Sequence, residues 1–387
     1  MKSETFNLVV EKILSLFQIN SRYMIIQDVI NHLEKLAPQA YSEDFDNTGL
    51  LVGDSNQPLT GVLVTLDTLE AVVDEAIDNN CNLIVSFHPI IFKGLKKLTG
   101  SNYVERTVLK AIQNNVSIFA IHTALDNAKL GVNGIICEQL GLINRNILIP
   151  QQQTIKKLTT YAPIKEAALL RQALFDAGAG GIGNYDECSF NVDGTGTYKG
   201  NDESNPTKGK KLQQHQEPET QISVTFAKHL ESKVLKALFK NHSYEEVAYE
   251  VITLENTNQN IGMGMVGELN NPMSAEDFLT SLKSIMKTGC IRHSALTEQP
   301  IKKVAVLGGS GSFAISAAKR AGAQIFITAD LKYHDFFQAE NKIILADIGH
   351  YESEQFTKNF LVAYLTKKIT NFAVVLSRTN TNPVKYF

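Results

Sequence analysis

Four side chains of types that commonly bind divalent metals each follow an apolar segment of strand length. They are His88 at the end of LIVSFH, Asp126 just past IFAIH, His350 after IILADIG, and Glu354 four residues further on. Open α/β sheets hold their ligands at the carboxyl ends of the strands, so a site is expected at such positions. Residues i and i+4 share one helix face, so His350 and Glu354 could bind one ion together. Imidazole and carboxylate donors without a thiolate suit Zn²⁺, Mn²⁺, Fe²⁺, Co²⁺ or Ni²⁺ and do not select among them.

Each of these residues also has a purely structural interpretation. A histidine at a strand end is more often a hydrogen-bonded loop residue than a ligand, and for His88 alone that interpretation is favoured. Glu354 in the first turn of a helix would interact with the helix dipole, by roughly 0.3–1 kcal/mol. His122 and Asp126 could pair with each other. The metal-site hypothesis therefore depends on the coincidence of four such residues, from both halves of the chain, at equivalent strand ends.

Two further segments place polar groups after predicted strands. GGSGS (308–312) lies between a strand and a helix, where its backbone N–H groups could bind an anion, although a tight glycine turn explains it equally well. ITADLKYHD (327–335) places a polar cluster just past a strand, and a loop histidine is the alternative for His334. DFDNTGLLVGD (44–54) is explained by turn or capping chemistry. The substrate-binding candidates are Gly309, Ser310, Gly311, His122 and Asp330.

Strand-length apolar runs alternate with helical patterns in two stretches of the chain, which predicts parallel, buried strands joined by helices. The first stretch contains VLVTLD, LIVSFH and VSIFAIH, and the second contains KVAVLGG, QIFITAD, IILADIG and FAVVLSR. We therefore predict two similar α/β lobes, 24–153 and 257–387, that form one discontinuous domain.

The middle of the chain, 154–256, follows a different plan. Two strand–helix–strand halves in about a hundred residues predict an inserted ferredoxin-like α+β module. Between the halves, the polar segment 200–221 has no apolar period and is predicted to be a long exposed loop. The first residues, 1–23, are predicted to form an amphipathic N-terminal helical extension and not a signal peptide.

Composition excludes several classes of protein. The 387 residues contain 37 Lys and Arg against 40 Asp and Glu, in no long block of one sign, so a nucleic-acid partner is not expected. No apolar run approaches the roughly 20 residues that cross a bilayer, so no membrane association is expected. Four cysteines, far apart and without a CxxC pair, favour a reducing, cytoplasmic setting.

Taken in order, these segments resemble the family of GTP cyclohydrolase I type 2 homologues, also described as dinuclear-metal-centre hexameric or NGG-interacting-factor-like proteins. The resemblance covers most of the chain after about residue 24. It is carried by DNTGLLVGD, HPIIFKGLKKLTG, HTALDNAKLGVN, GGSGS and DIGHYESE, and within the insert by DAGAGGIGNYDECSFNVDGTGTYK and HSYEEVAYEV.

The resemblance implies two divalent ions in a pocket between the lobes, held by a His-His pair, an Asp and a GHxxxE motif. By position, His88 is the second histidine of the pair, Asp126 follows the HTxxD pattern and bridges, and His350 and Glu354 are the last two ligands. Phe87 stands where many members have the first histidine and cannot bind a metal. One or two ions per chain are therefore expected, with His122 as the nearest alternative donor.

The leading functional hypothesis is a metal-dependent hydrolase that acts on a nucleotide or another phosphorylated small molecule. The resemblance supplies GTP ring opening as the candidate reaction, in which a divalent ion activates water for attack on the purine imidazole ring. Glu352 or His334 is the candidate for proton transfer. The alternative is a non-enzymatic protein that stores, delivers or senses an ion, or an assembly scaffold. The resemblance also implies a toroidal homohexamer.

Overall fold

The computed structural model describes residues 24–387. The predicted N-terminal helical extension, 1–23, lies outside them. The chain divides into two compact units, of which one combines the chain up to Ile149 with Asn260–Phe387 and the other is Pro150–Gln259. The predicted bounds of the insert, 154 and 256, fall a few residues inside the second unit. The architecture is mixed α/β.

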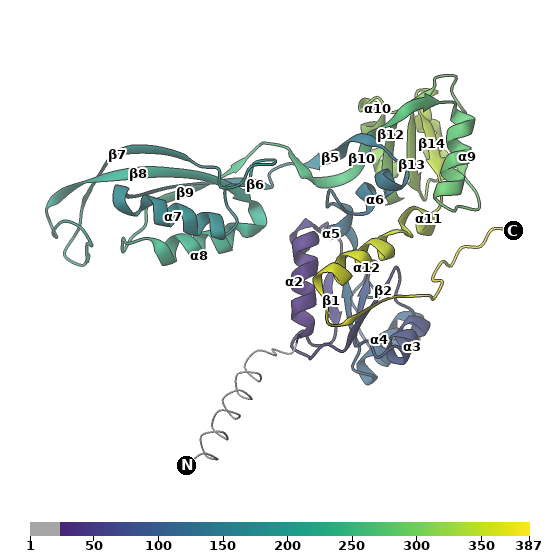
Figure 1. Ribbon diagram of the computed structural model, residues 1–387, viewed down its shortest axis with the longest axis horizontal. Coiled ribbons are helices and arrows are strands. Elements are labelled where there is room, and N and C mark those ends of the chain that lie inside the picture. The colour runs from purple at the N-terminus through teal and green to yellow at the C-terminus, as the bar shows by residue number, and fades with distance from the viewer. Residues whose placement is uncertain (1–23) are drawn as a thin grey trace, which may run out of the picture. The chain divides into compact units, whose positions relative to one another are not determined.

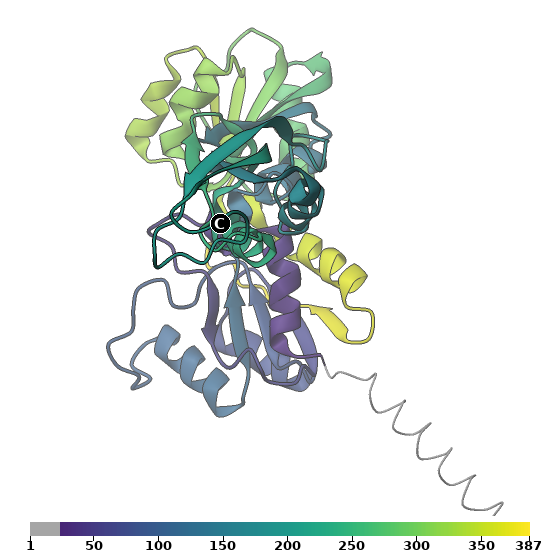
Figure 2. The same ribbon diagram turned by 90° about the vertical axis from the view of Figure 1, so that its left-hand side faces the viewer.

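The first sheet of the larger unit has the order β1-β4-β3-β2-β15, with β1 antiparallel and the other pairs parallel. Its strands are β1 (Gly49–Val52), β2 (Gly61–Thr65), β3 (Leu83–Ser86), β4 (Ser117–Ala120) and β15 (Ala373–Leu376). Every residue of β2, β3 and β4 is buried, because helices cover both faces of the sheet. Val62 and Val64 pack in one core cluster with α2 (Ile26–Leu36) and α12 (Thr357–Lys368), whereas Leu63 packs with α3 (Glu70–Asp78) and α4 (Tyr103–Gln113). Figure 2 shows α2 in purple beside α12 in yellow.

The second sheet has the order β11-β14-β13-β12-β10-β5, and β12, β13 and β14 run parallel, side by side in Figure 1. Its strands are β5 (Ile143–Gln151), β10 (Asn258–Met273), β11 (Arg292–His293), β12 (Ile301–Ser310), β13 (Ile325–Ala329) and β14 (Ile344–Asp347). The helices of this half are α6 (Val132–Gln139), α9 (Ala275–Ile285), α10 (Ile315–Arg320) and α11 (His350–Glu354), with 3₁₀ turns at Ser312–Ala314 and Tyr333–Ala339. The short helix α5 (His122–Asp126) follows β4 of the first sheet and contacts both α6 and the 3₁₀ turn at Gln39–Tyr41.

Two strands lie in the other lobe from the one predicted. β15, from the predicted lobe 257–387, adds to the first sheet by pairing with β2, from Ala373 opposite Gly61 to Leu376 opposite Val64. β5, from the predicted lobe 24–153, is in the second sheet. The edge of β2 away from β3 needs a partner for its backbone groups, and β15 provides it. Each sheet therefore contains one strand from the other predicted lobe, so the lobes are not simply consecutive along the chain.

The smaller unit is a single antiparallel sheet of order β7-β8-β6-β9 with two helices packed against it. The elements are β6 (Ile155–Pro163), α7 (Ile164–Asp176), β7 (Phe190–Lys199), β8 (Gln214–Ala227), a 3₁₀ turn at Lys228–Leu230, α8 (Glu231–Asn241) and β9 (Tyr249–Leu254). Leu158, Leu174 and Val224 belong to its own apolar core, to which Val234 and Leu238 of α8 also contribute.

The prediction of one exposed loop over 200–221 is wrong in its second half. β8 begins at Gln214 and pairs with β7 from Lys199 opposite Gln214 to Phe190 opposite Ser223, so the loop is confined to 200–213. Residues 214–218 alternate between exposed and half-buried, which is the two-residue period of a strand built from polar side chains. Apolar periodicity therefore gave no signal here.

No helix among residues 24–387 combines the length and the hydropathy needed to cross a bilayer.

Candidate metal centre

Three of the four predicted ligands meet at one point of the larger unit. Oε2 of Glu354 lies 3.1 Å from Nε2 of His88 and 3.3 Å from Nε2 of His350. One donor atom from each residue lies within 4.8 Å of the other two. Donors held about 2.0–2.2 Å from a common ion are roughly 3–3.6 Å apart at angles of 90–120°, so the two contacts to Glu354 fit a shared cation.

The end of β3 fixes the position of His88. The N–H groups of Phe87 and His88 donate to the carbonyls of Thr65 and Leu66, which continues the parallel pairing past the strand. Nδ1 of His88 lies 2.8 Å from Oδ1 of Asp67, and because a carboxylate only accepts, Nδ1 carries the proton. Nε2 is thereby left to face Glu354 and a cation.

The turn after β14 positions His350 and Glu354. Gly349 has φ 93°, and a Cβ there would lie 2.3 Å from Oε2 of Glu352, so a side chain at this position would be strained and crowded. The turn starts α11, whose single turn brings His350 over Glu354 as the i, i+4 spacing predicted. Nδ1 of His350 donates to Oδ2 of Asp330 at 2.7 Å.

A third imidazole, His122, lies beside these groups. Its ring centroid is 5.3 Å from that of His88, and its Nδ1 donates to Oδ1 of Asp46 at 2.8 Å. Asp46 also accepts from the backbone N–H of Thr123 at 3.1 Å. His122 is outside the set of three closest donors but has the same carboxylate-backed arrangement.

Asp126, the fourth predicted ligand, has one carboxylate oxygen without a hydrogen-bond partner among the described residues. Its Oδ1 is buried and accepts no hydrogen bond from residues 24–387. Burial, and after it the negative charge of Glu354, raises the pKa of Asp126 well above its usual range. Oε2 of Glu354 likewise accepts no well-aligned hydrogen bond, although both histidines are within ion-pair distance. A cation between these carboxylates would satisfy both oxygens.

Without a cation, the histidines act as the countercharge. Burial lowers the pKa of His88, but the charge of Glu354 and the hydrogen bond with Asp67 outweigh burial and raise it to about 10. Burial is likewise outweighed at His350, where the hydrogen bond with Asp330 and the charge of Glu354 raise the pKa to about 11. Burial raises the pKa of Glu354, but the charges of His88 and His350 lower it to about 2.

The donor set fits a divalent metal ion. Each imidazole has one nitrogen held by a carboxylate and the other available, which is the usual outer arrangement of metal-binding histidines. Two imidazoles and carboxylate oxygens suit the ions predicted above and favour none of them. Phe87 is fully buried and packs against the rings of His88 and His122, at 4.8 and 5.6 Å, so this position contributes no donor.

The glycine-rich segment after β12 has its own hydrogen-bond partners. The N–H of Gly308 donates to Oδ1 of Asn133, and the N–H of Gly309 donates to Oγ of Ser353 at 2.9 Å. Ser310 donates through Oγ to Asp330, Gly311 precedes a 3₁₀ turn, and α10 has six residues. These contacts leave the N–H of Gly309 already paired, and an anion site at Gly309, Ser310 and Gly311 stays a prediction.

A cavity of about 440 Å³ lies beside the donors and is lined by His88, His350 and Glu352. Glu352 is 6% exposed and accepts at Oε1 from Nδ2 of Asn382 at 3.1 Å. His334 is exposed, meets the ring of Tyr333 edge to face, and is not among the residues that line the cavity. The other lining residues are Leu66, Asp67, Arg292, Asp330, Asp347, Gly349, Tyr351, Asn382, Pro383, Val384 and Tyr386.

Sequence reasoning missed two carboxylates that orient the histidines. Asp67 stands at the carboxyl end of a predicted strand, so the rule that selected His88 would have selected it too. Asp46 was explained by turn chemistry, and no local signal relates it to His122, which lies 76 residues away.

Comparisons with known proteins agree on one family. Residues 24–383 match the family described as Duf34/NIF3 (NGG1p interacting factor 3). A Bacillus subtilis (strain 168) protein named GTP cyclohydrolase 1 type 2 homolog is 36% identical over 366 residues, or 93% of this chain and 98% of that protein. A Staphylococcus aureus (strain COL) protein of the same name is 35% identical over 94% of this chain and all of its own length. The crystal structure of a Bacillus cereus protein related to NIF3 matches with a TM-score of 0.82 and 34% identity, over 95% of this chain and all of that one.

Proposed function

The chain belongs to the Duf34/NIF3 family, and from that premise we propose that it binds a divalent metal ion and uses it to hydrolyse a small polar substrate. His88, His350 and Glu354 are the proposed ligands, with Asp126 as a fourth. The name that these relatives carry supports GTP, or a related nucleotide, as the first substrate to test.

The observation that carries the proposal is the cavity beside the donors. Structural metal sites are closed by protein ligands, whereas catalytic sites keep a position open to water or substrate. Both histidines of the centre line a space of about 440 Å³, which is within the range of small-molecule sites. An ion at this place would therefore keep open positions toward the cavity.

The roles of the chain's own residues follow from their contacts. A divalent ion here would lower the pKa of a coordinated water toward neutrality. Asp67 and Asp330 hold His88 and His350 in one tautomer and one orientation. Glu352, on the cavity wall, is the proton acceptor that we propose, and Asn382 fixes its carboxylate by a hydrogen bond.

The test loads the purified full chain with Mn²⁺ or Zn²⁺, counts the ions per chain, and measures formate release from GTP. Attack of one water opens the imidazole ring to a formamide, and a second water releases that carbon as formate, so the assay reports the two hydrolytic steps together. Glu354→Gln is expected to lose the ion and the activity. Glu340→Gln is the matched control, because Glu340 pairs with Lys319 and Lys342 on the surface.

The outcomes separate the two parts of the proposal. If the wild type binds the ion, Glu354→Gln does not, and no nucleotide is turned over, then nucleotide hydrolysis is rejected and metal binding stands. If Glu354→Gln binds the ion as tightly as the wild type, the proposed ligand set is rejected.

The second candidate function is metal binding without catalysis, for storage, delivery or sensing. Two residues, Glu352 and His334, were candidates for proton transfer, and only Glu352 lines the cavity. The absence of His334 from the cavity wall supports binding without catalysis. The homohexamer and the ferredoxin-like class of the insert also stay proposals. The sheet order β7-β8-β6-β9 supports the latter, and light scattering on the full chain tests the former.

A further inference from the structure

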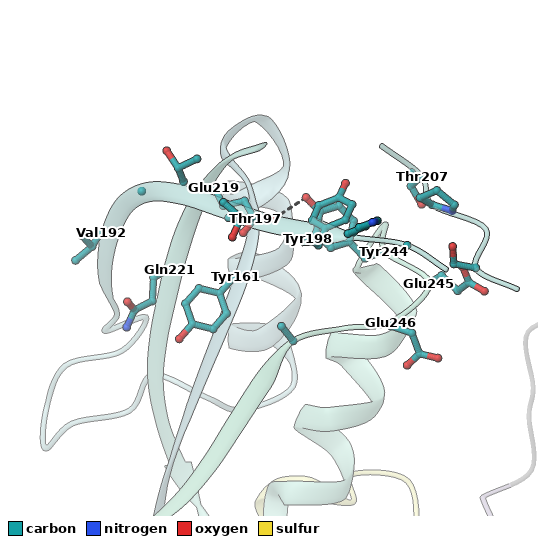
Figure 3. A pocket seen from close by; sticks show the side chains of 18 residues that line it. Tyr161, Val192, Thr197, Tyr198, Thr207, Glu219, Gln221, Tyr244, Glu245 and Glu246 are labelled. Carbon is teal, nitrogen blue, oxygen red and sulfur yellow. Dashed lines mark hydrogen bonds between the residues drawn. The ribbon is translucent and has the colours of Figure 1, made fainter. Parts of the chain in front are cut away.

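The smaller unit contains a cavity of about 590 Å³ that shares no residue with the candidate metal centre. Its walls come from β6, β7 and β8 together with the segments 200–207 and 244–248, and Figure 3 shows the side chains that line it. The volume is within the roughly 300–1,000 Å³ of sites that enclose small molecules.

Two glycines on β7 keep the floor of this cavity open. Alternate residues of a strand share a face, so Val192, Gly194, Gly196 and Tyr198 point the same way. A Cβ on Gly194 would meet nothing within 4 Å, and a Cβ on Gly196 would lie 2.1 Å from Oε2 of Glu219. Glycine weakens a strand interior and commonly marks the close approach of another group. These glycines therefore preserve a space into which the Glu219 carboxylate projects.

Glu219 is a buried carboxylate without a countercharge. The residue is 8% exposed, and its Oε1 accepts from the Tyr244 hydroxyl at 2.6 Å, the dashed line in Figure 3. Oε2 accepts no hydrogen bond from the described residues, and no Lys, Arg or His of residues 24–387 lies within ion-pair distance of it. An ionised carboxylate withdrawn from water is costly unless a positive charge or several donors face it.

Three tyrosine rings line the same cavity as this carboxylate. The rings of Tyr198 and Tyr244 meet edge to face with centroids 6.0 Å apart, and Tyr161 lies across the cavity from them (Figure 3). Tyr198 is held by its hydroxyl, which donates to the carbonyl of Lys208 at 3.0 Å. Tyr244 is held by its backbone N–H, which donates to Nδ1 of His242 at 3.1 Å. The aromatic surfaces are therefore ordered before any ligand binds.

The field inside the cavity is negative. The lining residues include three carboxylates, Glu219, Glu245 and Glu246, and one ammonium, on the exposed Lys199. Burial, and after it the charges of Glu217 and Glu219, raises the pKa of Tyr198. The combination of negative field and ordered aromatic faces disfavours an anionic ligand and favours a cationic one.

We propose that this cavity binds a small organic cation, an ammonium or guanidinium compound, whose charge faces Glu219 and packs against the tyrosine rings. Aromatic faces attract such cations, most strongly where both are shielded from water. A bare metal ion does not fit, because it needs several donor atoms and the cluster of metal-competent groups within residues 24–387 lies at His88, not here.

The test compares ligands of one shape and different charge. Choline, its uncharged isostere 3,3-dimethylbutan-1-ol, and agmatine as the guanidinium probe are titrated into the full chain by calorimetry. The chain has no tryptophan, so tyrosine fluorescence provides a second readout. We expect choline or agmatine to bind at least about tenfold more tightly than the alcohol. Equal binding of choline and the alcohol, or no binding of either cation at millimolar concentration, overturns the proposal.

Two variants locate the binding. Glu219→Gln keeps the shape of the side chain and removes its charge, so cation affinity is expected to fall about tenfold, to that of the neutral alcohol. Glu231→Gln is the control in the same unit, because Glu231 pairs with Lys156 and does not line the cavity. Tyr198→Leu provides an independent loss of affinity if Glu219→Gln does not fold. Unchanged cation binding by a folded Glu219→Gln variant assigns the site elsewhere and rejects the proposal.

Discussion

At the scale of single residues, Asp67 is the clearest case of a group that acts through a ligand. It accepts from Nδ1 of His88 at 2.8 Å and does not belong to the three-residue donor cluster. Loss of such an outer carboxylate costs about 10–100-fold in metal affinity. We expect Asp67→Asn to weaken ion binding by that factor in calorimetric titration and Asp74→Asn, which alters an exposed pair with Lys110, to leave it unchanged. Equal affinities of the wild type and Asp67→Asn would mean that His88 does not bind the ion.

The histidine pKa values predict proton release on metal binding. With His88 near 10 and His350 near 11, both rings are protonated at pH 7 when no ion is bound. A cation must displace both Nε2 protons, so at least two protons are expected to leave per ion, and affinity is expected to rise at least about 100-fold per pH unit near neutrality. Titrations in buffers of different ionisation enthalpy measure this number. A count near zero would contradict coordination by these rings.

The same shifts predict how pH affects the stability of the metal-free protein. The pKa values of His88 and His350 are raised in the folded state, so their stabilisation is complete below about 6.5 and is lost as the pH rises through 10 and 11. The pKa of Glu354 is lowered, so its stabilisation is present above about 4.5 and is lost as the pH falls through 2. Urea unfolding in the presence of a chelator should therefore show a decline above pH 6.5 that His350→Gln reduces.

How much of the site the sequence predicts depends on where the signal lies. His88, His350 and Glu354 were found because strand ends and i, i+4 spacing are local patterns, and the structure brings them together. His334 follows a strand as well, but the 3₁₀ turn beginning at Tyr333 leaves its side chain exposed. Position after a strand thus selects the right edge of the sheet but not which side chains face the cavity. That choice is set by tertiary contacts such as the bond from His122 to Asp46.

At the scale of elements, the C-terminal segment after β15 forms part of the cavity wall and contacts two carboxylates that line the cavity. Glu75 of α3 holds its start by accepting from Oγ of Ser377 and the N–H of Arg378, both at 2.7 Å. Further on, Thr381 donates to Oδ2 of Asp67 at 2.6 Å, and Asn382 donates to Glu352. The segment therefore holds both Asp67, which orients His88, and Glu352, the proposed proton acceptor.

We expect Thr381→Val to lower ion affinity about tenfold, because Asp67 loses the donor that fixes its second oxygen. The matched control is Thr370→Val, since Thr370 is exposed and its hydroxyl contacts only the side chain of Asn371. A chain that ends at Asn380 should show at least the Thr381→Val effect. If that truncated chain binds the ion as the full chain does, the segment has no part in the site.

The sequence pattern does not predict which sheet β5 and β15 join, and the reason is physical. The run FAVVLSR predicts a buried strand, and β15 is there at Ala373–Leu376, but nothing local says which sheet edge it joins. The partner is decided by the free edge of β2 and by α12, which packs against α2, β2 and β15. The start of β8 shows a second limit of sequence patterns, because its polar residues form a strand that has no apolar face to reveal it.

At the scale of the whole molecule, the two compact units have separate cores and separate candidate sites. Leu158, Leu174 and Val224 pack only within Pro150–Gln259, whereas the metal-competent cluster lies in the other unit. A ligand stabilises only the cooperative unit that binds it, by about 2.7 kcal/mol when its free concentration is 100 times the dissociation constant. We therefore expect two calorimetric unfolding transitions, one raised by Mn²⁺ or Zn²⁺ and the other raised by the organic cation.

Two variants test whether each ligand acts on its own unit. Glu354→Gln should abolish the metal-induced shift and leave the cation-induced shift intact, and Glu219→Gln should do the reverse. Because exchanged strands join both sheets of the larger unit, its two lobes should unfold together and not as two further transitions. A single transition raised by both ligands would show that the insert and its host unfold as one cooperative body. A metal-induced shift that survives Glu354→Gln would instead remove the basis for the ligand set on which the residue-scale predictions depend.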